Sequence, residues 1–470
     1  MRVVFLYLVV MALAAYAWRD WFKALCGLIV LMAVMNHEDM PRSIMGIQGL
    51  NPWNVLMFFI VLSWAASRSR EGLVWDMPRP ITVLLLLYLG VVLVGFARLM
   101  ADRSHLDHMT TTSLISEELI NTIKWTIPGL LLFDGCRNRQ RLTLAVCCVL
   151  GIYLVVALQV ANRLPAACAM GGVEDAEYLR LKLVGSIGYS ACDMSTMLAG
   201  ASWAMLAALS VCRTKWQKFM LIGAAALTVY SQALTGGRAG YMAWGVVGLA
   251  MMLLKWRKYL LVAPLIPMVL YMLFPAAAER AVQGFSETNV AGEGYVDNYL
   301  VTSGRTLLWP HVIDKILESP AQGYGRLAME RTGLTASVQA TYAQDEAFTH
   351  PHNAYLEWLL DNGIVGMTPV ILFFGTILVW SAILFCDRSD PWCATVGGMA
   401  FSLLLAQLLG GIGAQHFYPQ PSALGMWAAI FLALRLTAMR SSTRASRVRS
   451  CGRGRQLELG QQWPTRLTMS

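Results

Sequence analysis

Two histidines stand where the longest polar stretch of this chain meets an apolar run. His350 and His352 close a polar segment spanning 276–352, and the apolar run follows from Asn353. Histidine titrates near neutral pH, so a histidine here could take a proton from a substrate or return one. The pair could instead cap a helix and contact interfacial water. As metal ligands, two histidines at i and i+2 with no obvious third partner are a weak signal, and we expect neither a metal nor a cofactor.

Several cations fall in polar segments that we place on the same side as the histidines. They are Arg180, Lys182, Arg238, Arg305 and Arg326. Arginine binds phosphate bidentately, and cations stabilise a departing diphosphate as its charge grows. Asn353 suits a helix N-cap, and the helix N-terminus behind it favours anions. Singly, each residue could be structural, and Arg238 could merely snorkel. Together they indicate a site for a lipid diphosphate, where a histidine deprotonates an attacking sugar hydroxyl.

The composition indicates that these residues belong to a membrane protein. Of 470 residues, 57% are hydrophobic and only 14% are charged, whereas soluble proteins carry roughly a quarter charged residues. The apolar runs are long and continuous, which favours membrane helices over an alternating barrel pattern. We therefore expect an all-α polytopic protein with about 12 membrane helices. Candidate spans lie near 3–18, 22–35, 54–67, 79–98, 118–134, 140–161, 193–212, 217–234, 238–254, 258–275, 354–385, 394–411 and 421–438.

The net charge of +9 reports topology rather than nucleic-acid binding. Basic residues gather in alternate short loops, near 68–79, 137–141, 213–218 and 255–258, and in the C-terminal tail. By the positive-inside rule these loops face the cytoplasm. The loops that carry the histidines and the candidate cations then face outward. We expect membrane lipids as partners, with the tail near anionic headgroups, and no nucleic acid.

Four parts follow from this reading of the chain. Residues 1–275 form an N-terminal transmembrane bundle, 276–353 an outward catalytic loop, 354–438 the C-terminal membrane helices and 439–470 a basic cytoplasmic tail. Within the long loop, apolar residues recur at helical spacing over Arg305–Leu317 and predict a short amphipathic helix. Pro310 could kink that helix or begin it, and Pro320 ends it.

The cysteines leave one pairing open. There are 10 cysteines, and they form no CxxC pair. Cys168 and Cys192 lie in or beside one outward loop, so they could form a disulfide in an oxidising compartment.

An ordered set of motifs resembles the O-antigen ligase family over about 230–366. That family includes O-antigen ligases, Wzy-type polysaccharide polymerases and some oligosaccharide transferases to protein. The motifs are Gly237-Arg238-Ala239-Gly240, Gly304-Arg305-x-x-x-Trp309, Pro320-x-x-Gly323-x-Gly325, Pro351-His352-Asn353-x-x-Leu356-Glu357 and Gly363-x-x-Gly366. The resemblance implies a GT-C-like membrane transferase that works without metal or nucleotide and takes a glycan from undecaprenyl diphosphate in the periplasm.

The resemblance also implies roles for particular residues. His352 is the general base, and Arg238 and Arg305 hold phosphate or shape the site. Lys182, with Arg180 beside it, is the nearest match to a further basic position before a glycine, here Gly185. The Pro-Asn pair usual after that glycine is absent.

The resulting interpretation is an inverting glycosyltransferase of the bacterial inner membrane. It would transfer an undecaprenyl-diphosphate-linked glycan to the lipid A core or to another lipid-linked repeat unit. The alternative is a transporter or flippase of lipid-linked oligosaccharide. Transporters usually place ionisable residues or broken helices near the midplane. Few charges fall in the middle of a candidate span here, and Lys124 is the exception.

Overall fold

The computed structural model consists almost wholly of helices. It describes residues 2–35, 37, 40, 43–44, 47–172, 176–283, 287–288, 294–296, 302, 304–342, 348–414 and 417–440. Within these residues the strands are limited to two short antiparallel pairs, β1 (Ser43–Ile44) with β2 (Ile47–Gln48) and β3 (Glu287–Thr288) with β4 (Gly294–Tyr295). The all-α expectation is therefore confirmed.

The described residues contain six helices long and apolar enough to cross a membrane. They are α4 (Arg79–Ala101), α8 (Arg139–Arg163), α11 (Ala191–Ala208) with its extension to Val211, α20 (Ala354–Cys386), α21 (Pro391–Gly410) and the C-terminal helix Pro421–Arg440. A pair bent by 118°, α14 (Leu265–Leu273) and α15 (Pro275–Val282), would make seven. A multi-pass helical membrane protein is thus confirmed.

Judged by length and composition, the described helices that could cross a membrane are fewer than the expected 12 or so. Three apolar segments that the sequence suggested as spans are shorter helices: α1 (Arg2–Ala17), α2 (Trp21–Met35) and α13 (Arg238–Leu254). Two further helices of the bundle, α3 (Pro52–Arg68) and α12 (Lys215–Thr235), also fall outside the six. The segment read as one span at 258–275 divides into a 3-10 helix, η4 (Arg257–Leu261), and α14.

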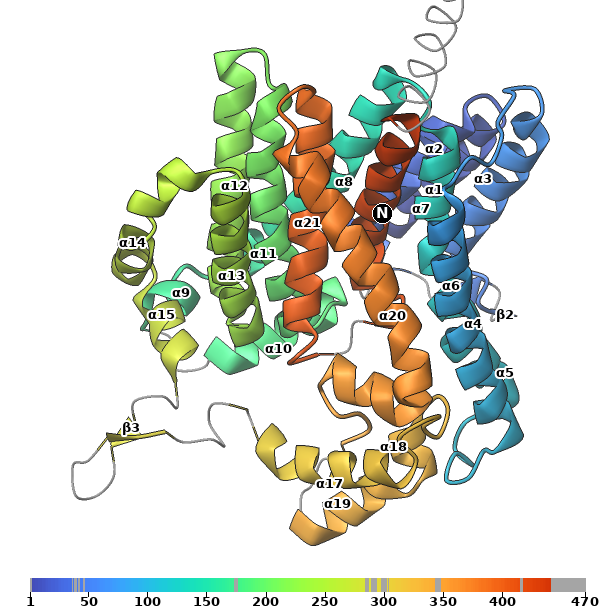
Figure 1. Cartoon of the computed structure of the whole chain (residues 1–470), viewed down its shortest axis with the longest axis vertical. Helices are drawn as coiled ribbons and strands as arrows, with labels where there is room; N and C mark the ends of the chain where they lie inside the picture. The colour runs from blue at the N-terminus through green and yellow to red at the C-terminus, as the bar shows by residue number, and fades with distance from the viewer. Residues whose placement is uncertain are drawn as a thin grey trace, which may run out of the picture.

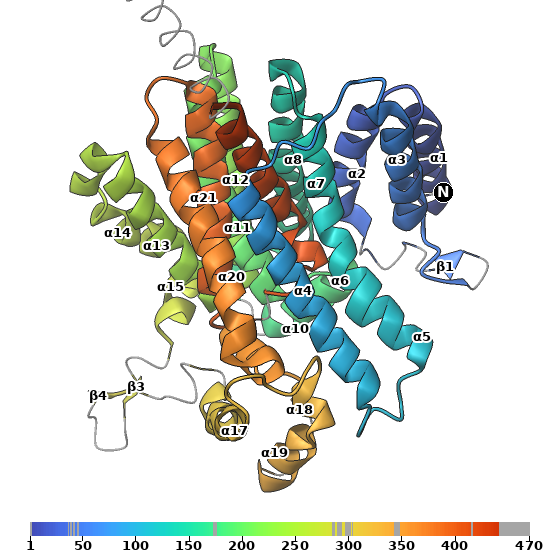
Figure 2. The same ribbon diagram turned by 45° about the vertical axis from the view of Figure 1, so that its right-hand side comes forward.

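The centre of the bundle is built from closely packed helices. Helix α11 contacts α12, α13 and α21, and α21 in turn packs on α20 (Figure 2). Small residues permit this closeness: a Cβ added to Gly200 of α11 would lie 2.9 Å from the Cα of Leu403 on α21. Such contacts between small residues are the usual means by which membrane helices associate, since lipid offers no hydrophobic drive between them.

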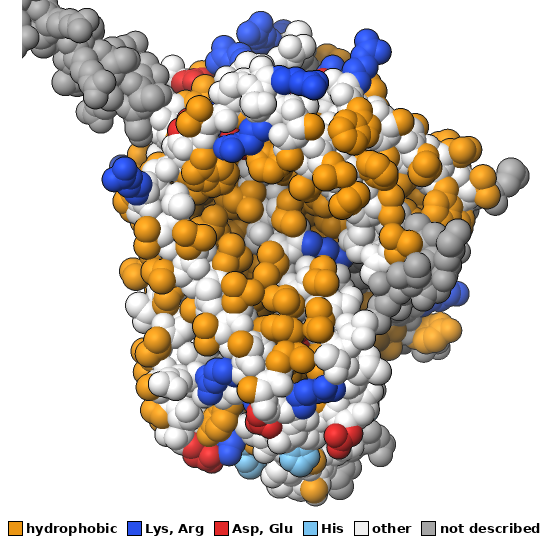
Figure 3. Space-filling view, turned by 90° about the vertical axis from the view of Figure 1, so that its right-hand side faces the viewer, with side chains coloured by type: hydrophobic (Ala, Val, Ile, Leu, Met, Phe, Trp, Pro, Cys, Tyr) orange, Lys and Arg blue, Asp and Glu red, His pale blue; other side chains and the backbone are white. Residues whose placement is uncertain are grey.

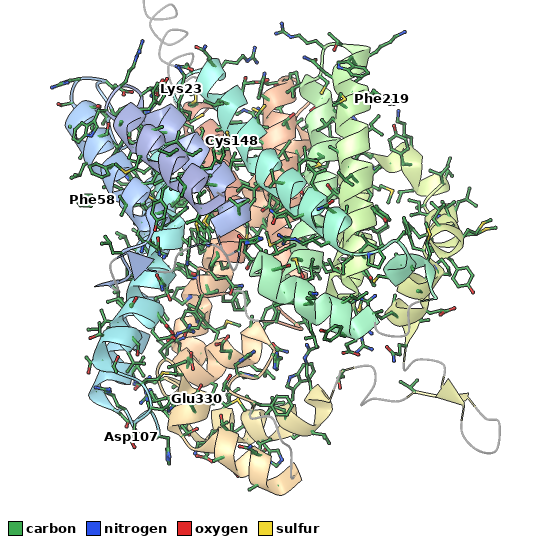
Figure 4. All side chains as sticks on the ribbon, turned by 180° about the vertical axis from the view of Figure 1, so that it is seen from behind. Lys23, Phe58, Asp107, Cys148, Phe219 and Glu330 are labelled. Carbon is green, nitrogen blue, oxygen red and sulfur yellow. The ribbon has the colours of Figure 1, made fainter. Side chains whose placement is uncertain are left out.

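The two ends of the molecule differ in their side chains. Figure 3 shows a broad hydrophobic band with charged side chains gathered above and below it. Lys23 and Phe219 mark one end, and Asp107 and Glu330 mark the other (Figure 4). We call them the basic end and the polar end. The short helices α17 (Arg305–Glu318), α18 (Ala328–Arg331) and α19 (Leu334–Tyr342) lie below the bundle, at the polar end (Figure 1).

The amphipathic helix expected over Arg305–Leu317 is confirmed as α17. Pro310 lies inside this helix, so it neither begins nor ends it. The helix ends at Glu318, before Pro320. Its apolar face is buried through Leu308 and Val312 against α18 and α20. Residues 284–286, 289–293, 297–301, 303 and 343–347 of the predicted loop, and 441–470 of the predicted tail, lie outside the described residues.

Candidate active site

The two histidines lie on a sharp turn that leads into α20. His352 has a positive φ of 51°, a left-handed conformation that is uncommon for a residue other than glycine. Neighbouring contacts hold the turn. Trp309 Nε1 of α17 donates to Pro351 O at 3.0 Å, and Ala354 N donates to Gly411 O at 2.7 Å. Strained backbone of this kind persists only where the surroundings determine it.

Asn353 is the N-cap of α20. Its side-chain oxygen accepts from Tyr355 N at 3.0 Å and from Leu356 N at 3.2 Å. These bonds satisfy two of the four amide groups that a helix start leaves without partners. The Asn353 side-chain oxygen is therefore hydrogen-bonded within its own helix. This cap fixes the backbone directly after His352.

The two imidazoles lie against each other. Their ring centroids are 4.0 Å apart, and the ring of Phe348 stands edge-on to His352 at 6.1 Å. Burial, followed by the charges of His350 and Arg305, lowers the pKa of His352 to about 4. Burial and Arg305 also lower the pKa of His350. Both rings are therefore uncharged at neutral pH, and an uncharged imidazole has a nitrogen free to accept a proton.

Arg305, whose charge acts on both histidines, also lines a cavity of about 150 Å³. We call it the arginine cavity, because four of its lining residues are Arg180 of α10 (Ala176–Ile187), Arg238 of α13, Arg280 of α15 and Arg305 of α17. Glu177 is the one acidic residue among the lining residues. Four guanidinium groups that line one cavity create a positive potential that favours a polyanion.

Backbone oxygens hold three of these arginines, and Arg238 Nη1 donates to Gln283 O at 3.4 Å. Arg180 is buried and donates from Nε to Leu234 O at 3.2 Å and from Nη2 to Cys168 O at 3.0 Å. Arg280 Nε donates to Gly236 O at 2.8 Å. Gly236 has a φ of 72°, and a Cβ there would lie 2.5 Å from Arg180 Cζ. The glycine is required because the α12–α13 turn passes directly over a guanidinium.

Arg305 connects the arginine cavity with the histidines. It lines the cavity, and its charge acts on Arg238 and on both His350 and His352. An anion bound to Arg305 would therefore lie beside the imidazoles.

The structure separates two predicted cations from this group. Lys182 is exposed on α10 and does not line the arginine cavity. Arg326 is enclosed by carboxylates instead. Its Nε lies 2.6 Å from Glu118, and its Nη1 lies 3.6 Å from Glu357 and 3.8 Å from Asp361. Its guanidinium also stacks 3.5 Å above the ring of Tyr418.

Sequence reasoning missed Arg280. It falls at the start of the segment read as a long loop, where one more arginine carries no motif. The signal available was its place in Pro275–Val282, a short helix that follows an apolar run. The disulfide considered for Cys168 and Cys192 is absent, and both residues are free cysteines.

The remaining motif glycines join a turn to a break in α20. At Gly363 the helix is interrupted, with φ 62° and ψ −170°. The turn Pro320–Gly325 fills the interruption: Tyr324 N donates to Leu360 O at 2.9 Å, and Ile364 N donates to Pro320 O at 2.9 Å. A Cβ at Gly323 would lie 2.5 Å from Leu360 O. These glycines therefore allow the close backbone approach that sets the direction of the first turns of α20.

No group of three or more His, Cys, Asp or Glu side chains suited to a metal is found among the described residues. His350 and His352 therefore do not belong to a larger group of potential metal ligands among these residues.

Two comparisons with known proteins bear on the class of this protein. Residues 223–371 match the family model described as O-antigen ligase. This segment contains the α12–α13 turn, α17, the histidine turn and the break in α20. The predicted resemblance to that family is therefore confirmed.

A relative in Rickettsia conorii (strain ATCC VR-613 / Malish 7) carries the name "Putative polysaccharide ligase". It is 26% identical to this chain over 147 residues. The matched stretch is 30% of this chain and 34% of the relative. The chain is therefore compared with only about a third of that protein.

Proposed function

We propose that this protein is an inner-membrane glycosyltransferase of surface polysaccharide biosynthesis. It transfers a glycan from undecaprenyl diphosphate to a hydroxyl of the lipid A core or of another lipid-linked repeat unit. The observation that carries the proposal is Arg305, which lines the arginine cavity and whose charge also acts on the uncharged His352. A diphosphate held by the arginines then presents its sugar beside a base.

The reaction follows as one displacement. His352 accepts the proton of the acceptor hydroxyl, and that oxygen forms a bond to the anomeric carbon. The bond from this carbon to the phosphate oxygen breaks, and its electron pair stays on the diphosphate. A single displacement inverts the anomeric configuration. This GT-C-like scheme uses no metal, because cations already surround the leaving group.

The arginines stabilise the negative charge that grows on the leaving diphosphate. We assign this role to Arg238 and Arg305, with Arg180 and Arg280 behind them. Arg180 rather than Lys182 is the α10 contact, since Lys182 does not line the cavity. Burial keeps the pKa of His352 low, and the neighbouring His350 and Arg305 lower it further.

The orientation in the membrane supports a periplasmic site. Loops rich in lysine and arginine lie at the basic end, which the positive-inside rule assigns to the cytoplasm. The α17–α19 layer, and the histidine turn that Trp309 of α17 holds, lie at the polar end (Figure 2). Lipid-linked glycans awaiting ligation or polymerisation would reach the site from that side.

Reconstitution tests the proposal. The purified protein in lipid nanodiscs would receive an undecaprenyl-diphosphate-linked repeat unit, with and without lipid A core, and the products would be separated on a gel. A ladder from donor alone identifies a polymerase, and product that requires the core identifies a ligase. An intact donor in both mixtures would contradict the transferase.

A transporter of lipid-linked oligosaccharide is the second candidate. The break in α20 at Gly363 and the buried ionic group around Arg326 are features that transporters use. It would be favoured if proteoliposomes moved the donor between leaflets while the same preparation formed no product.

A further inference from the structure

A larger cavity lies on the other side of the start of α20. Its volume is about 650 Å³, and it is separate from the arginine cavity, with no lining residue in common. It is bounded by the start of α3, the irregular helical run from α5 (Thr111–Leu114) to α7 (Ile127–Gly135), α20 and the segment before the C-terminal helix. Neither histidine of the active-site turn lines it.

The lining of this larger cavity combines aromatic faces with amides. The rings of Trp53 and Trp125 lie 4.7 Å apart, and Tyr418 provides a third ring. Asn51 and Asn121 provide side-chain amides. The apolar face of a sugar ring packs on an aromatic ring, while its hydroxyls need hydrogen-bonding partners such as amides. This mixture suits a saccharide better than a lipid chain.

Lys124 places a cation inside the cavity. Its side chain is buried, and among the described residues its one hydrogen bond is to Asn54 Oδ1, at 3.2 Å. An ammonium group has three donors, so two remain without a protein acceptor there. The group instead lies over the rings of Trp125 and Trp53, at 4.4 and 5.4 Å from their centroids. Two carboxylates line the cavity, Glu117 and Glu357. No ion pair joins Lys124 to a described carboxylate, and the Glu357 carboxylate faces Arg326.

A second donor in the same wall also lacks a partner. The indole nitrogen of Trp53 is buried and has no hydrogen-bond partner among the described residues. A buried donor without an acceptor destabilises the folded protein, because the group has lost its hydrogen bonds to water. Two neighbouring donor groups that need acceptors, beside two aromatic faces, indicate an occupant that supplies negatively charged oxygen.

The cavity also lies close to the reaction centre. Glu357 lines it, and the N-cap Asn353 directly follows His352. Glu357 lies four positions after Asn353, which is about 6 Å along the helix axis. A sugar in the larger cavity can therefore belong to a glycan whose reacting end lies at His352.

We infer that this larger cavity binds a sugar residue carrying an anionic group. The group is a carboxylate or a phosphate substituent, and it lies at Lys124 while the sugar ring packs on Trp53 and Trp125. The inference rests on the proposed function, because it makes this sugar part of the donor or acceptor glycan. It adds a preference for acidic glycans that the arginine cavity alone does not provide.

Direct binding tests this without turnover. The full-length protein in nanodiscs would be titrated calorimetrically with a hexuronate-containing oligosaccharide and with the same oligosaccharide after its carboxyl groups are reduced to alcohols. A phosphorylated oligosaccharide forms the third arm. The two acidic probes are compared with the reduced one, and whichever binds more tightly identifies the anionic group. We expect a preference of at least about tenfold over the reduced probe.

Variants of Lys124 assign the effect. Lys124→Met should reduce binding of the acidic probe to the level of the reduced probe, while Lys124→Arg should keep the preference. Lys23→Met is the matched control, because Lys23 is exposed at the basic end, and it should change nothing. Equal binding of acidic and reduced probes by the unaltered protein, or an unchanged preference in Lys124→Met with an unaltered melting temperature, would overturn the inference.

The outcomes separate this inference from the proposed function. Transfer activity without acidic preference leaves the transferase standing and removes the acidic-sugar site. A preference for acidic probes without transfer activity keeps the acidic-sugar site and removes the transferase. If both hold, Lys124→Met raises KM for whichever substrate carries the anionic sugar, so measuring KM for donor and acceptor identifies its source.

Discussion

The arginine cavity and the Arg326 cluster use the same side chain in opposite ways. Arg326 has Glu118, Glu357 and Asp361 around it, so its charge is compensated within the protein. The arginine cavity gathers four guanidinium groups, and Glu177 is the one acidic residue among its lining residues. Arg326 ties elements together through its ion pairs, whereas four cations that line one cavity are placed to bind an external anion. The surroundings of an arginine, rather than its presence, therefore separate structure from function at the polar end.

Of the predicted changes, substituting His352 should have the largest effect on transfer activity. His352→Ala removes the proposed general base, and general-base catalysis is worth about 10²–10⁴ in rate. We expect kcat for transfer to fall by that factor while the melting temperature changes little. The measurement is the initial rate in nanodiscs. An activity within a few-fold of the unaltered protein would exclude His352 as the base.

Arg326→Met should instead affect stability. Removing one partner of a buried ion pair typically costs about 3–5 kcal/mol, because the remaining charges lose their compensation. We expect a clearly lower thermal unfolding temperature and, at low temperature, transfer activity within a few-fold of normal. Combining Arg326→Met with Glu118→Gln should recover part of the lost stability. A fully stable but inactive Arg326→Met would place Arg326 with the substrate-binding arginines.

Arg305→Ala should show the reverse pattern. Loss of one group that stabilises transition-state charge costs about 10²–10³ in kcat, and we expect an unfolding temperature close to normal. Rates measured on the same preparations as Arg326→Met give the comparison directly. If Arg305→Ala unfolds as readily as Arg326→Met, the distinction between the two regions fails.

The pH profile should show a smaller effect. The pKa of His352 is lowered to about 4, so the imidazole is unprotonated through the neutral range and becomes protonated as pH falls through that value. The transfer rate should be flat between about pH 6 and 7 and fall about tenfold per pH unit below the pKa. Stopped assays at controlled pH measure it. A decline centred near pH 6.5 would show an ordinary exposed histidine.

Lys182→Ala should give the smallest effect. Lys182 is exposed on α10 and does not line the arginine cavity, whereas Arg180 on the same helix does. We expect Lys182→Ala to keep transfer within about twofold, since exposed charges contribute little, and Arg180→Ala to reduce it markedly. Rates of the two variants compared side by side provide the check. A larger loss in Lys182→Ala would reverse their assignment.

Local patterns in the sequence were enough to locate several parts of the site. Apolar spacing and Pro320 predicted α17 to within one residue at its C-terminus. Asn353 before an apolar run predicted the N-cap. Gly304, Arg305 and Trp309 were recognised as one motif, although only the fold showed that Trp309 holds the carbonyl of Pro351. The count of about 12 spans is not confirmed, because apolar composition alone does not distinguish a crossing helix from a short or bent one.

The sequence by itself determined the class of the protein: an apolar, helical, multi-pass chain with one basic end and an ordered His–Arg motif set. Those features depend on composition and on near neighbours. The tertiary structure alone decided which cations act together, because Arg180, Arg238, Arg280 and Arg305 come from four different helices. It also paired Arg326 with Glu118, 208 positions away. Which charges lie close enough to interact depends on distances in space, and the spacing of residues along the chain does not reveal those distances.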